Sequence, residues 1–206
     1  YEIDLPAGAS AGTPVMVLLH GRGADRHDLF SLRPRLPADW IVLAPEAPFP
    51  AAPWGYGPGS AWYKFLGRNR PEPDSFSASI DALHEFVAAI PALTKLTPGP
   101  ITLVGFSQGG TLAMAYALTH PDAAASIINL SGFLADHTRV AVNKNTVGQT
   151  RFFWGHGRRD PNIPFELATE GQAWLRQAGT QLESRAYDIG HWIDPRELRD
   201  ALDWLI

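Results

Sequence analysis

Gly105-Phe106-Ser107-Gln108-Gly109 is the stretch of sequence that decides the fold of this chain. The apolar residues 101–104 come directly before it, and residues 111–118, which have helical apolar spacing, come directly after it. A strand that turns sharply into a helix leaves little room beside the serine, and the flanking glycines relieve that crowding. The motif predicts an exposed serine at a helix N-terminus, where backbone N–H groups stabilise developing negative charge.

A second stretch, Gly8-Ala9-Ser10-Ala11-Gly12, matches the same pattern but lacks this context. No apolar strand precedes it, and Thr13-Pro14 follows it, which is typical of a surface turn. The predicted nucleophile is therefore Ser107 and not Ser10.

Composition favours one folded domain over residues 1–206, since 45% of the residues are hydrophobic and 18% are charged. A net charge of -4 gives no electrostatic reason to expect a nucleic-acid partner. No apolar run reaches the roughly 20 residues of a bilayer span, and the N-terminus lacks a signal-like layout, so we expect no transmembrane segment and a cytoplasmic location. The absence of cysteine excludes thiolate catalysis and Cys-based metal sites.

Strand-like and helix-like segments alternate along the chain, the pattern of an α/β sheet. Strands are expected at 14–20, 40–44, 101–106, 126–131, 150–155 and 181–187. Helices are expected at about 25–33, 75–94, 108–119, 165–178 and 195–205. Residues 45–73 form an irregular loop rich in aromatic residues, and residues 132–149 form a second one; loops of this length are usually functional or mobile. Asp194, Pro195 and Glu197 mark the start of the last helix as N-cap, first position and third position.

A serine hydroxyl needs a base to take its proton and an acid to orient that base. Enzymes with this strand–serine–helix motif carry the serine, the acid and the histidine in that order along the chain. The histidines that follow Ser107 are His120, His137, His156 and His191. His191 is the predicted base because it lies in a loop after the last strand, at the sheet edge where such folds place functional groups.

Three aspartates compete for the role of the acid. Asp194 already caps a helix, and Asp188 lies only three positions before His191. Asp160 follows the strand at 150–155 in a loop of its own, which Pro161 stiffens. Asp160 is therefore the predicted acid.

The oxyanion hole needs two aligned N–H donors, one from the residue after the nucleophile and one from the loop after the first core strand. These are predicted to be the backbone amides of Gln108 and Arg22. The neighbouring His20 and the later His156 are interpreted as structural residues.

Several motifs in order resemble the carboxylesterase/phospholipase branch of the α/β-hydrolases, which includes acyl-protein thioesterases. They are Leu18-Leu19-His20-Gly21-Arg22-Gly23, Ala44-Pro45-Glu46-Ala47-Pro48, Ala61-Trp62-Tyr63, Gly105-Phe106-Ser107-Gln108-Gly109-Gly110, Leu130-Ser131-Gly132, Gly155-His156-Gly157-Arg158-Arg159-Asp160 and Gly190-His191-Trp192-Ile193. The His-Gly-Arg-Gly form is more similar to bacterial esterases than to eukaryotic depalmitoylating enzymes. The resemblance implies an α/β-hydrolase fold, with a mostly parallel central sheet and helices on both faces. It also implies a serine hydrolase that needs neither metal nor organic cofactor, with Ser107, Asp160 and His191 as its triad.

The resemblance places Trp62 at the site, and Tyr63, Phe133 and Trp192 are further candidates for contacts with the substrate. Aromatic walls suit an apolar group, so we expect a carboxylesterase acting on small-molecule esters with short-to-medium acyl or aryl groups. A thioesterase or (lyso)phospholipase with the same triad is the nearest alternative, and a catalytically silent binding protein is the third. Arg22, Arg68 and Arg70 raise the separate hypothesis of an acidic substrate group. The sequence also leaves open whether the chain forms a homodimer.

Overall fold

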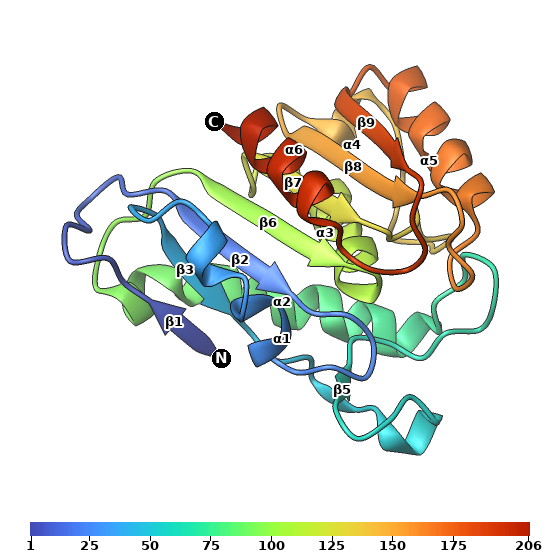
Figure 1. Cartoon of the computed structure of the whole chain (residues 1–206), viewed down its shortest axis with the longest axis horizontal. Helices are drawn as coiled ribbons and strands as arrows, with labels where there is room; N and C mark the ends of the chain where they lie inside the picture. The colour runs from blue at the N-terminus through green and yellow to red at the C-terminus, as the bar shows by residue number, and fades with distance from the viewer.

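A seven-stranded sheet runs through the middle of the computed structural model, which describes all of residues 1–206 (Figure 1). The strand order is β1-β3-β2-β6-β7-β8-β9, and every neighbouring pair is parallel except β1 with β3. The sheet strands are β1 (Glu2–Asp4), β2 (Val15–Leu19), β3 (Ile41–Ala44), β6 (Ile101–Phe106), β7 (Ser126–Leu130), β8 (Arg151–Gly157) and β9 (Gln181–Tyr187). The carboxyl ends of the parallel strands meet at one edge, where an open α/β sheet places its functional loops.

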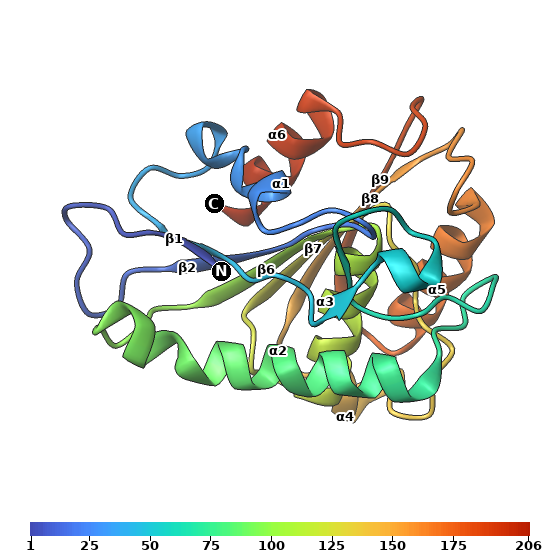
Figure 2. The ribbon, with the colours of Figure 1, turned by 90° about the horizontal axis from the view of Figure 1, so that it is seen from below.

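Helices cover both faces of this sheet (Figure 2). One face carries α2, α3 and α5 over the larger hydrophobic core, and the other carries α1 and α6 over a smaller one. The α-helices are α1 (His27–Phe30), α2 (Pro73–Thr94), α3 (Gln108–Thr119), α4 (Lys144–Val147), α5 (Phe165–Gln177) and α6 (Pro195–Leu205). The prediction of a mostly parallel sheet with helices on both faces is confirmed.

The turn from β6 into α3 brings backbone against backbone. A Cβ on Gly105 would lie 2.2 Å from the Gly109 carbonyl oxygen, and a Cβ on Gly109 would lie 2.0 Å from the Leu19 carbonyl oxygen of β2. Both distances are far below a real carbon–oxygen contact, so each position accepts only glycine. Ser107, between them, has φ 54° and ψ −115°, a conformation that non-glycine residues rarely adopt. The sequence requirement at this motif is therefore steric.

The expected helix at about 25–33 is wrong in its extent. Only α1 (His27–Phe30) is α-helical, and a 3₁₀ turn, η1 (Arg33–Arg35), follows it. Pro34 accounts for the difference, since it lacks the N–H that an α-helix would bond to the carbonyl four residues earlier. The sequence also gave no signal for the three-residue edge strand β1, or for α4 within 132–149.

The aromatic-rich segment 45–73 has more local order than expected. It contains a two-stranded antiparallel ribbon formed by β4 (Phe49–Pro50) and β5 (Ser60–Ala61), joined through the 3₁₀ turn η2 (Ala52–Trp54). A bridge between Ala24 and Ser60 ties this ribbon to the loop after β2. The segment is therefore fixed at the edge of the sheet where the site is expected.

Helix α2 is long and apolar enough, by length and composition alone, to cross a membrane. Here it packs on the sheet through a buried face that includes Ile80, Leu83 and Ile90, and it exposes Asp81 and Glu85 on the other side. This one-sided burial is the pattern of an amphipathic helix that covers a globular core.

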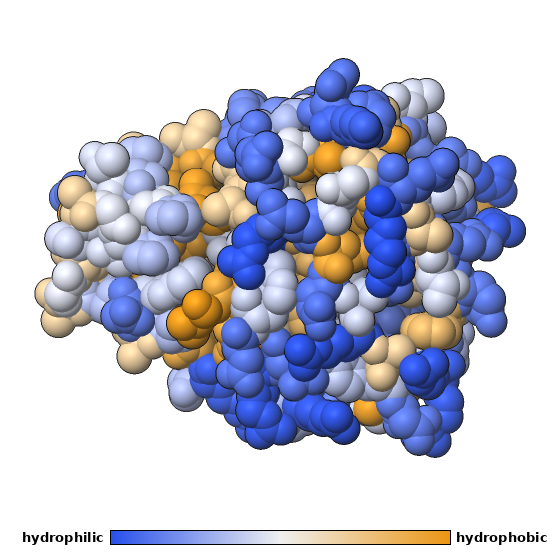
Figure 3. Space-filling view, turned by 90° about the horizontal axis from the view of Figure 1, so that it is seen from above, coloured by the Kyte–Doolittle hydropathy of each residue, from blue (hydrophilic) through white to orange (hydrophobic).

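Hydrophilic residues dominate the molecular face seen from above in Figure 3, and the hydrophobic residues there form small separate patches.

At the sheet edge, β9 carries the ion pair Arg185–Glu183, with 3.0 Å between Nε and Oε1, and Arg185 also forms an ion pair with Asp200. Charged side chains on an edge strand oppose pairing with another strand.

We expect Gly109→Ala to lower the free energy of unfolding by roughly 3 kcal/mol or more, because the new methyl group would overlap the backbone of β2. Gly8→Ala is the matched control, since a Cβ there has nothing within 4 Å, and its effect should stay within about 0.5 kcal/mol. Urea unfolding of both variants measures the difference. Equal stabilities would contradict the steric account of the motif.

Candidate active site

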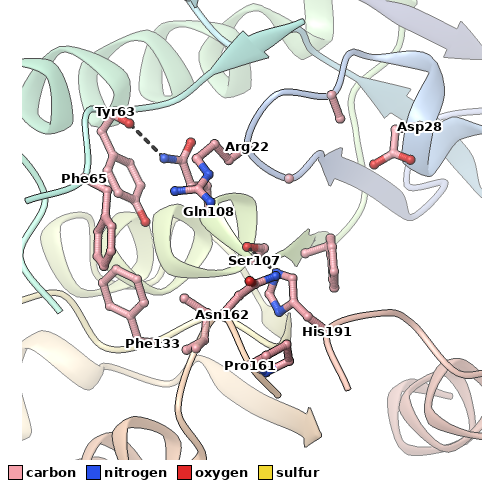
Figure 4. Close-up of a pocket in the computed structure, with 14 residues that line it drawn as sticks. Arg22, Asp28, Tyr63, Phe65, Ser107, Gln108, Phe133, Pro161, Asn162 and His191 are labelled. Atoms are coloured by element: carbon pink, nitrogen blue, oxygen red, sulfur yellow. Dashed lines mark hydrogen bonds between the residues drawn. The ribbon is translucent and has the colours of Figure 1, made fainter. Parts of the chain in front are cut away.

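Three loops at the carboxyl edge of the sheet bring Ser107, His191 and Asp160 together. Figure 4 shows Ser107 and His191 side by side in the cavity. Ser107 follows β6, Asp160 follows β8, and His191 follows β9. The Ser107 Oγ lies 2.9 Å from the His191 Nε2, and the His191 Nδ1 lies 2.6 Å from the Asp160 Oδ2. In the tautomer that satisfies both contacts, Nδ1–H donates to the carboxylate and Nε2 accepts from the serine hydroxyl.

The Asp160 carboxylate is buried and fully hydrogen-bonded. Its Oδ1 accepts from the backbone N–H groups of Asn162, at 2.8 Å, and Ile163, at 2.9 Å. Burial alone would raise its pKa, but the hydrogen bonds from His191 and Ile163 outweigh that effect and hold the pKa below its ordinary value. Asp160 is therefore an anion at neutral pH and stabilises positive charge on His191.

The other aspartates considered for the acid lie elsewhere. Asp188 is exposed and pairs with Arg159, with 2.8 Å between Oδ1 and Nε. Asp194 caps α6 by accepting from the Arg196 N–H at 2.8 Å, as its sequence position predicts. Neither carboxylate makes a hydrogen bond to His191.

The remaining histidines have structural contacts. His20 is buried, donates from Nδ1 to the Gly21 carbonyl at 2.8 Å, and accepts from the Ala47 N–H at Nε2, at 3.1 Å. His156 donates from Nε2 to the Ile163 carbonyl at 2.9 Å. Burial lowers the pKa of both residues, so both rings are neutral at pH 7. His120 and His137 pack against aromatic rings away from the three site loops.

Two backbone N–H groups beside Ser107 have no acceptor in the protein, those of Arg22 and Gln108. Arg22 comes from the loop after β2, and Gln108 is the first residue of α3. Both residues line the same cavity as Ser107. Two free amides next to a serine hydroxyl form a site able to hold an oxyanion.

The segment Ala61–Tyr63 joins the two sides of this oxyanion site. The Trp62 N–H donates to the Gln108 Oε1 at 3.1 Å, and the Gln108 Nε2 donates to the Tyr63 carbonyl at 2.8 Å. The Trp62 indole Nε1–H donates to the His20 carbonyl at 2.8 Å, directly before the loop that carries Arg22. One short segment therefore fixes both amide-bearing residues relative to each other.

A cavity of about 340 Å³ opens beside Ser107. Aromatic and aliphatic side chains form one part of its wall and polar groups form the rest (Figure 4). It is lined by Gly21, Arg22, Ala24, Asp28, Tyr63, Phe65, Phe106, Ser107, Gln108, Phe133, Pro161, Asn162, Ile163 and His191. The rings of Phe65 and Phe133 lie 5.8 Å apart between centroids.

Two of the four expected substrate contacts, Tyr63 and Phe133, line this cavity. Trp62 is not among the lining residues, and its indole is held by the bond to the His20 carbonyl. Trp192 lies outside this cavity as well, is 54% exposed, and borders a second hollow on the other side of His191.

The sequence did not single out Ile163 or Asp28 as wall residues. Ile163 comes from the loop that also carries Asp160, and Asp28 comes from α1. Neither belongs to a recognisable pattern. Phe65 belongs to the aromatic-rich loop at 45–73, which the sequence did point to. No group of three His, Asp or Glu side chains is arranged to hold a metal ion.

Glu197 is a buried carboxyl group at the start of α6. Its side chain lies against β8, where a Cβ on Gly155 would lie 2.3 Å from the Glu197 Oε1, and both carboxyl oxygens are shielded from solvent. Burial raises its pKa from the ordinary 4.5 to about 8. Glu197 is therefore protonated at neutral pH.

The fold and this site define an α/β-hydrolase, and the sequence comparisons agree. The model of the Phospholipase/Carboxylesterase family matches residues 4–206, so the chain belongs to that family. Acyl-protein thioesterase 1 of Candida albicans is 26% identical over 223 residues, which cover 98% of this chain and 95% of that protein. A probable carboxylesterase of Arabidopsis thaliana, SOBER1-like, is 32% identical over 113 residues. That match covers 53% of this chain and 43% of the Arabidopsis protein, so it spans less than half of that relative.

Solved structures share the fold over the whole chain. The crystal structure of esterase PE8 superposes with a TM-score of 0.79 at 25% identity, covering 99% of this chain and 96% of that one. The Bacillus cereus carboxylesterase superposes with a TM-score of 0.84 at 18% identity, covering 98% of this chain and 91% of that one. At that lower identity the likeness concerns the fold alone.

We expect the Glu197→Gln variant to lose less stability than wild type when the pH rises from 5 to 8. The pKa of Glu197 in the folded state is about 8 and its ordinary value is 4.5, so the folded state binds one more proton than the unfolded state between these values. Stability therefore falls as pH rises through that window, by up to roughly 1.4 kcal/mol per pH unit. Urea unfolding of wild type and variant at both pH values isolates this contribution. Equal losses in the two proteins would show that Glu197 is ionised when folded.

Proposed function

We propose that this chain is a serine carboxylesterase that hydrolyses short-to-medium acyl or aryl esters through Ser107, His191 and Asp160. The observation that carries the proposal is the continuous hydrogen-bond chain from the Ser107 hydroxyl through His191 to the ionised Asp160. A silent binding protein would not need these three groups in hydrogen-bond contact beside two free amides.

The proposed reaction has two acyl-transfer steps. His191 takes the proton of Ser107 as its Oγ bonds to the ester carbonyl carbon, and the amides of Arg22 and Gln108 stabilise the oxyanion. His191 then gives the proton to the departing alcohol as the carbon–oxygen bond breaks. Water attacks the acyl-enzyme with the same histidine as base, and the acid and free Ser107 are released. Asp160 holds the imidazole tautomer and stabilises the cation throughout.

The size of the cavity supports small acyl or aryl groups. Its volume of about 340 Å³ is near the lower end of ligand sites, which span roughly 300–1,000 Å³. The rings of Tyr63, Phe65 and Phe133 supply an apolar wall for the group bound to the carbonyl. Thioester hydrolysis by the same triad is the second candidate, because the relative in Candida albicans is named a thioesterase. Rates on oxygen and sulfur esters of one acyl group separate the two.

We expect Ser107→Ala to abolish hydrolysis of p-nitrophenyl esters, with kcat reduced by up to about 10⁶-fold. Asp160→Asn should lower kcat by about 10⁴-fold, because it favours the wrong tautomer of His191. Ser10→Ala is the control, since Ser10 occupies the exposed copy of the same sequence pattern. An acetate-to-palmitate series with wild type should favour the shorter chains. A flat profile or a preference for palmitate would contradict the proposed acyl size.

We expect Trp62→Phe to lower kcat by about tenfold and to change KM little. The variant loses the indole bond to the His20 carbonyl, which positions the Arg22 amide for the oxyanion. Trp174→Phe is the matched control, because Trp174 is 53% exposed and far from these contacts. If kcat is unchanged while thermal stability falls, the bond only supports the fold.

A further inference from the structure

Arg22 brings a positive charge into the cavity beside Ser107, and no carboxylate of the protein pairs with it. Its guanidinium instead lies over the ring of Tyr56, 4.6 Å from the centroid. Tyr56 is itself held, since its hydroxyl oxygen accepts from the Phe65 N–H at 2.8 Å. The guanidinium is therefore positioned by an aromatic platform while its hydrogen-bond donors stay free.

The other two arginines that the sequence offered for an acidic substrate group do not line this cavity. Arg68 forms an ion pair with Glu170, with 2.9 Å between Nη2 and Oε2. Arg70 lies two residues further along the chain, and its backbone carbonyl accepts a hydrogen bond from the Leu66 N–H. Only Arg22 combines a free guanidinium with a place beside the nucleophile.

Tyr63 forms part of the wall at the same end of the cavity. Its side chain is fully buried. Burial raises the pKa of its hydroxyl, and a hydrogen bond with Thr111 and the nearby Arg22 charge oppose that rise only in part, so Tyr63 stays neutral. Figure 4 shows the Arg22 guanidinium and the Tyr63 ring on the same side of Ser107.

Charges on the two sides of Ser107 have opposite sign. Asp28 lines the cavity on the far side from Tyr63 and also borders the hollow next to His191 and Trp192 (Figure 4). Because His191 must protonate the departing alcohol, the alcohol leaves on its side, and the acyl chain lies towards Arg22 and Tyr63. A negative group is therefore favoured on the acyl chain and disfavoured on the alcohol.

We propose that Arg22 selects esters whose acyl chain carries a carboxylate, that is, half-esters of small dicarboxylic acids. This inference rests on the proposed acyl transfer at Ser107. A single guanidinium matches the planar, two-oxygen geometry of a carboxylate. A phosphate group, with its greater charge, would need further cations that this cavity does not contain.

Monomethyl glutarate, methyl valerate and 4-acetoxybutyrate test this selection. The first carries a carboxylate on the acyl chain, and the second is its neutral counterpart. The third is an isomer of the first that carries the same charge on the alcohol. Acid release, titrated in a pH-stat, gives kcat/KM for each ester. We expect wild type to prefer monomethyl glutarate to methyl valerate by about tenfold, as for one charged hydrogen-bonded contact that is partly exposed, and to show no such preference for 4-acetoxybutyrate.

Arg22→Gln should bring the glutarate-to-valerate ratio close to one, and Arg22→Lys should leave an intermediate ratio. The ratio is the readout because any disturbance of the Arg22 backbone amide would lower both rates together and cancel. Added salt should reduce the wild-type ratio and leave that of Arg22→Gln unchanged.

An equal glutarate-to-valerate ratio in wild type and Arg22→Gln would overturn the inference. If wild type still hydrolyses methyl valerate, the proposed esterase function stands. A preference for 4-acetoxybutyrate over monomethyl glutarate would also overturn it, because the charge would then be recognised on the alcohol. Turnover of none of the three esters, or of any p-nitrophenyl ester, would overturn the proposed function together with the inference.

Discussion

The close approach of the β6–α3 turn to β2 is the constraint on which the rest of this site depends. Gly105 and Gly109 let the turn lie against the backbone, and Ser107 is held at φ 54° between them. A conformation of this kind costs free energy. It persists because β6, which leads into the turn, is held between β2 and β7. In return the serine hydroxyl faces His191, and the first amide of α3 points at the same space.

A second constraint connects segments that are far apart in the sequence. Residues Ala61–Tyr63 bond to the side chain of Gln108 on one side and to the carbonyl of His20 on the other. The loop after β2 and the start of α3 therefore share one rigid support. Preorganised amides of this kind stabilise charge without reorganising during the reaction. The irregular loop 45–73 therefore supports the segments that carry the Arg22 and Gln108 amides and also forms part of the cavity wall.

Local patterns in the sequence located most of the residues that the structure brings together at this site, and they failed where only packing decides. Ser107, Asp160 and His191 each follow a strand whose apolar run is visible in the sequence, so their loops could be assigned to one sheet edge. Trp62 and Tyr63 are adjacent residues in an extended segment, and such neighbours point to opposite sides. No local signal says which of them lines the cavity, and in the structure it is Tyr63. Glu197 matched a capping pattern, but nothing local indicated that its carboxyl group would be buried against Gly155 of β8.

The central claim is that Ser107 is the one serine activated by His191 and the oxyanion amides. A fluorophosphonate reagent followed by intact-mass and peptide analysis tests it directly, because only an activated serine reacts at low reagent concentration. The account predicts a single adduct on Ser107, absent from His191→Ala and unaffected in Ser10→Ala. A wild-type protein without an adduct, or with its adduct on another serine, would contradict the account.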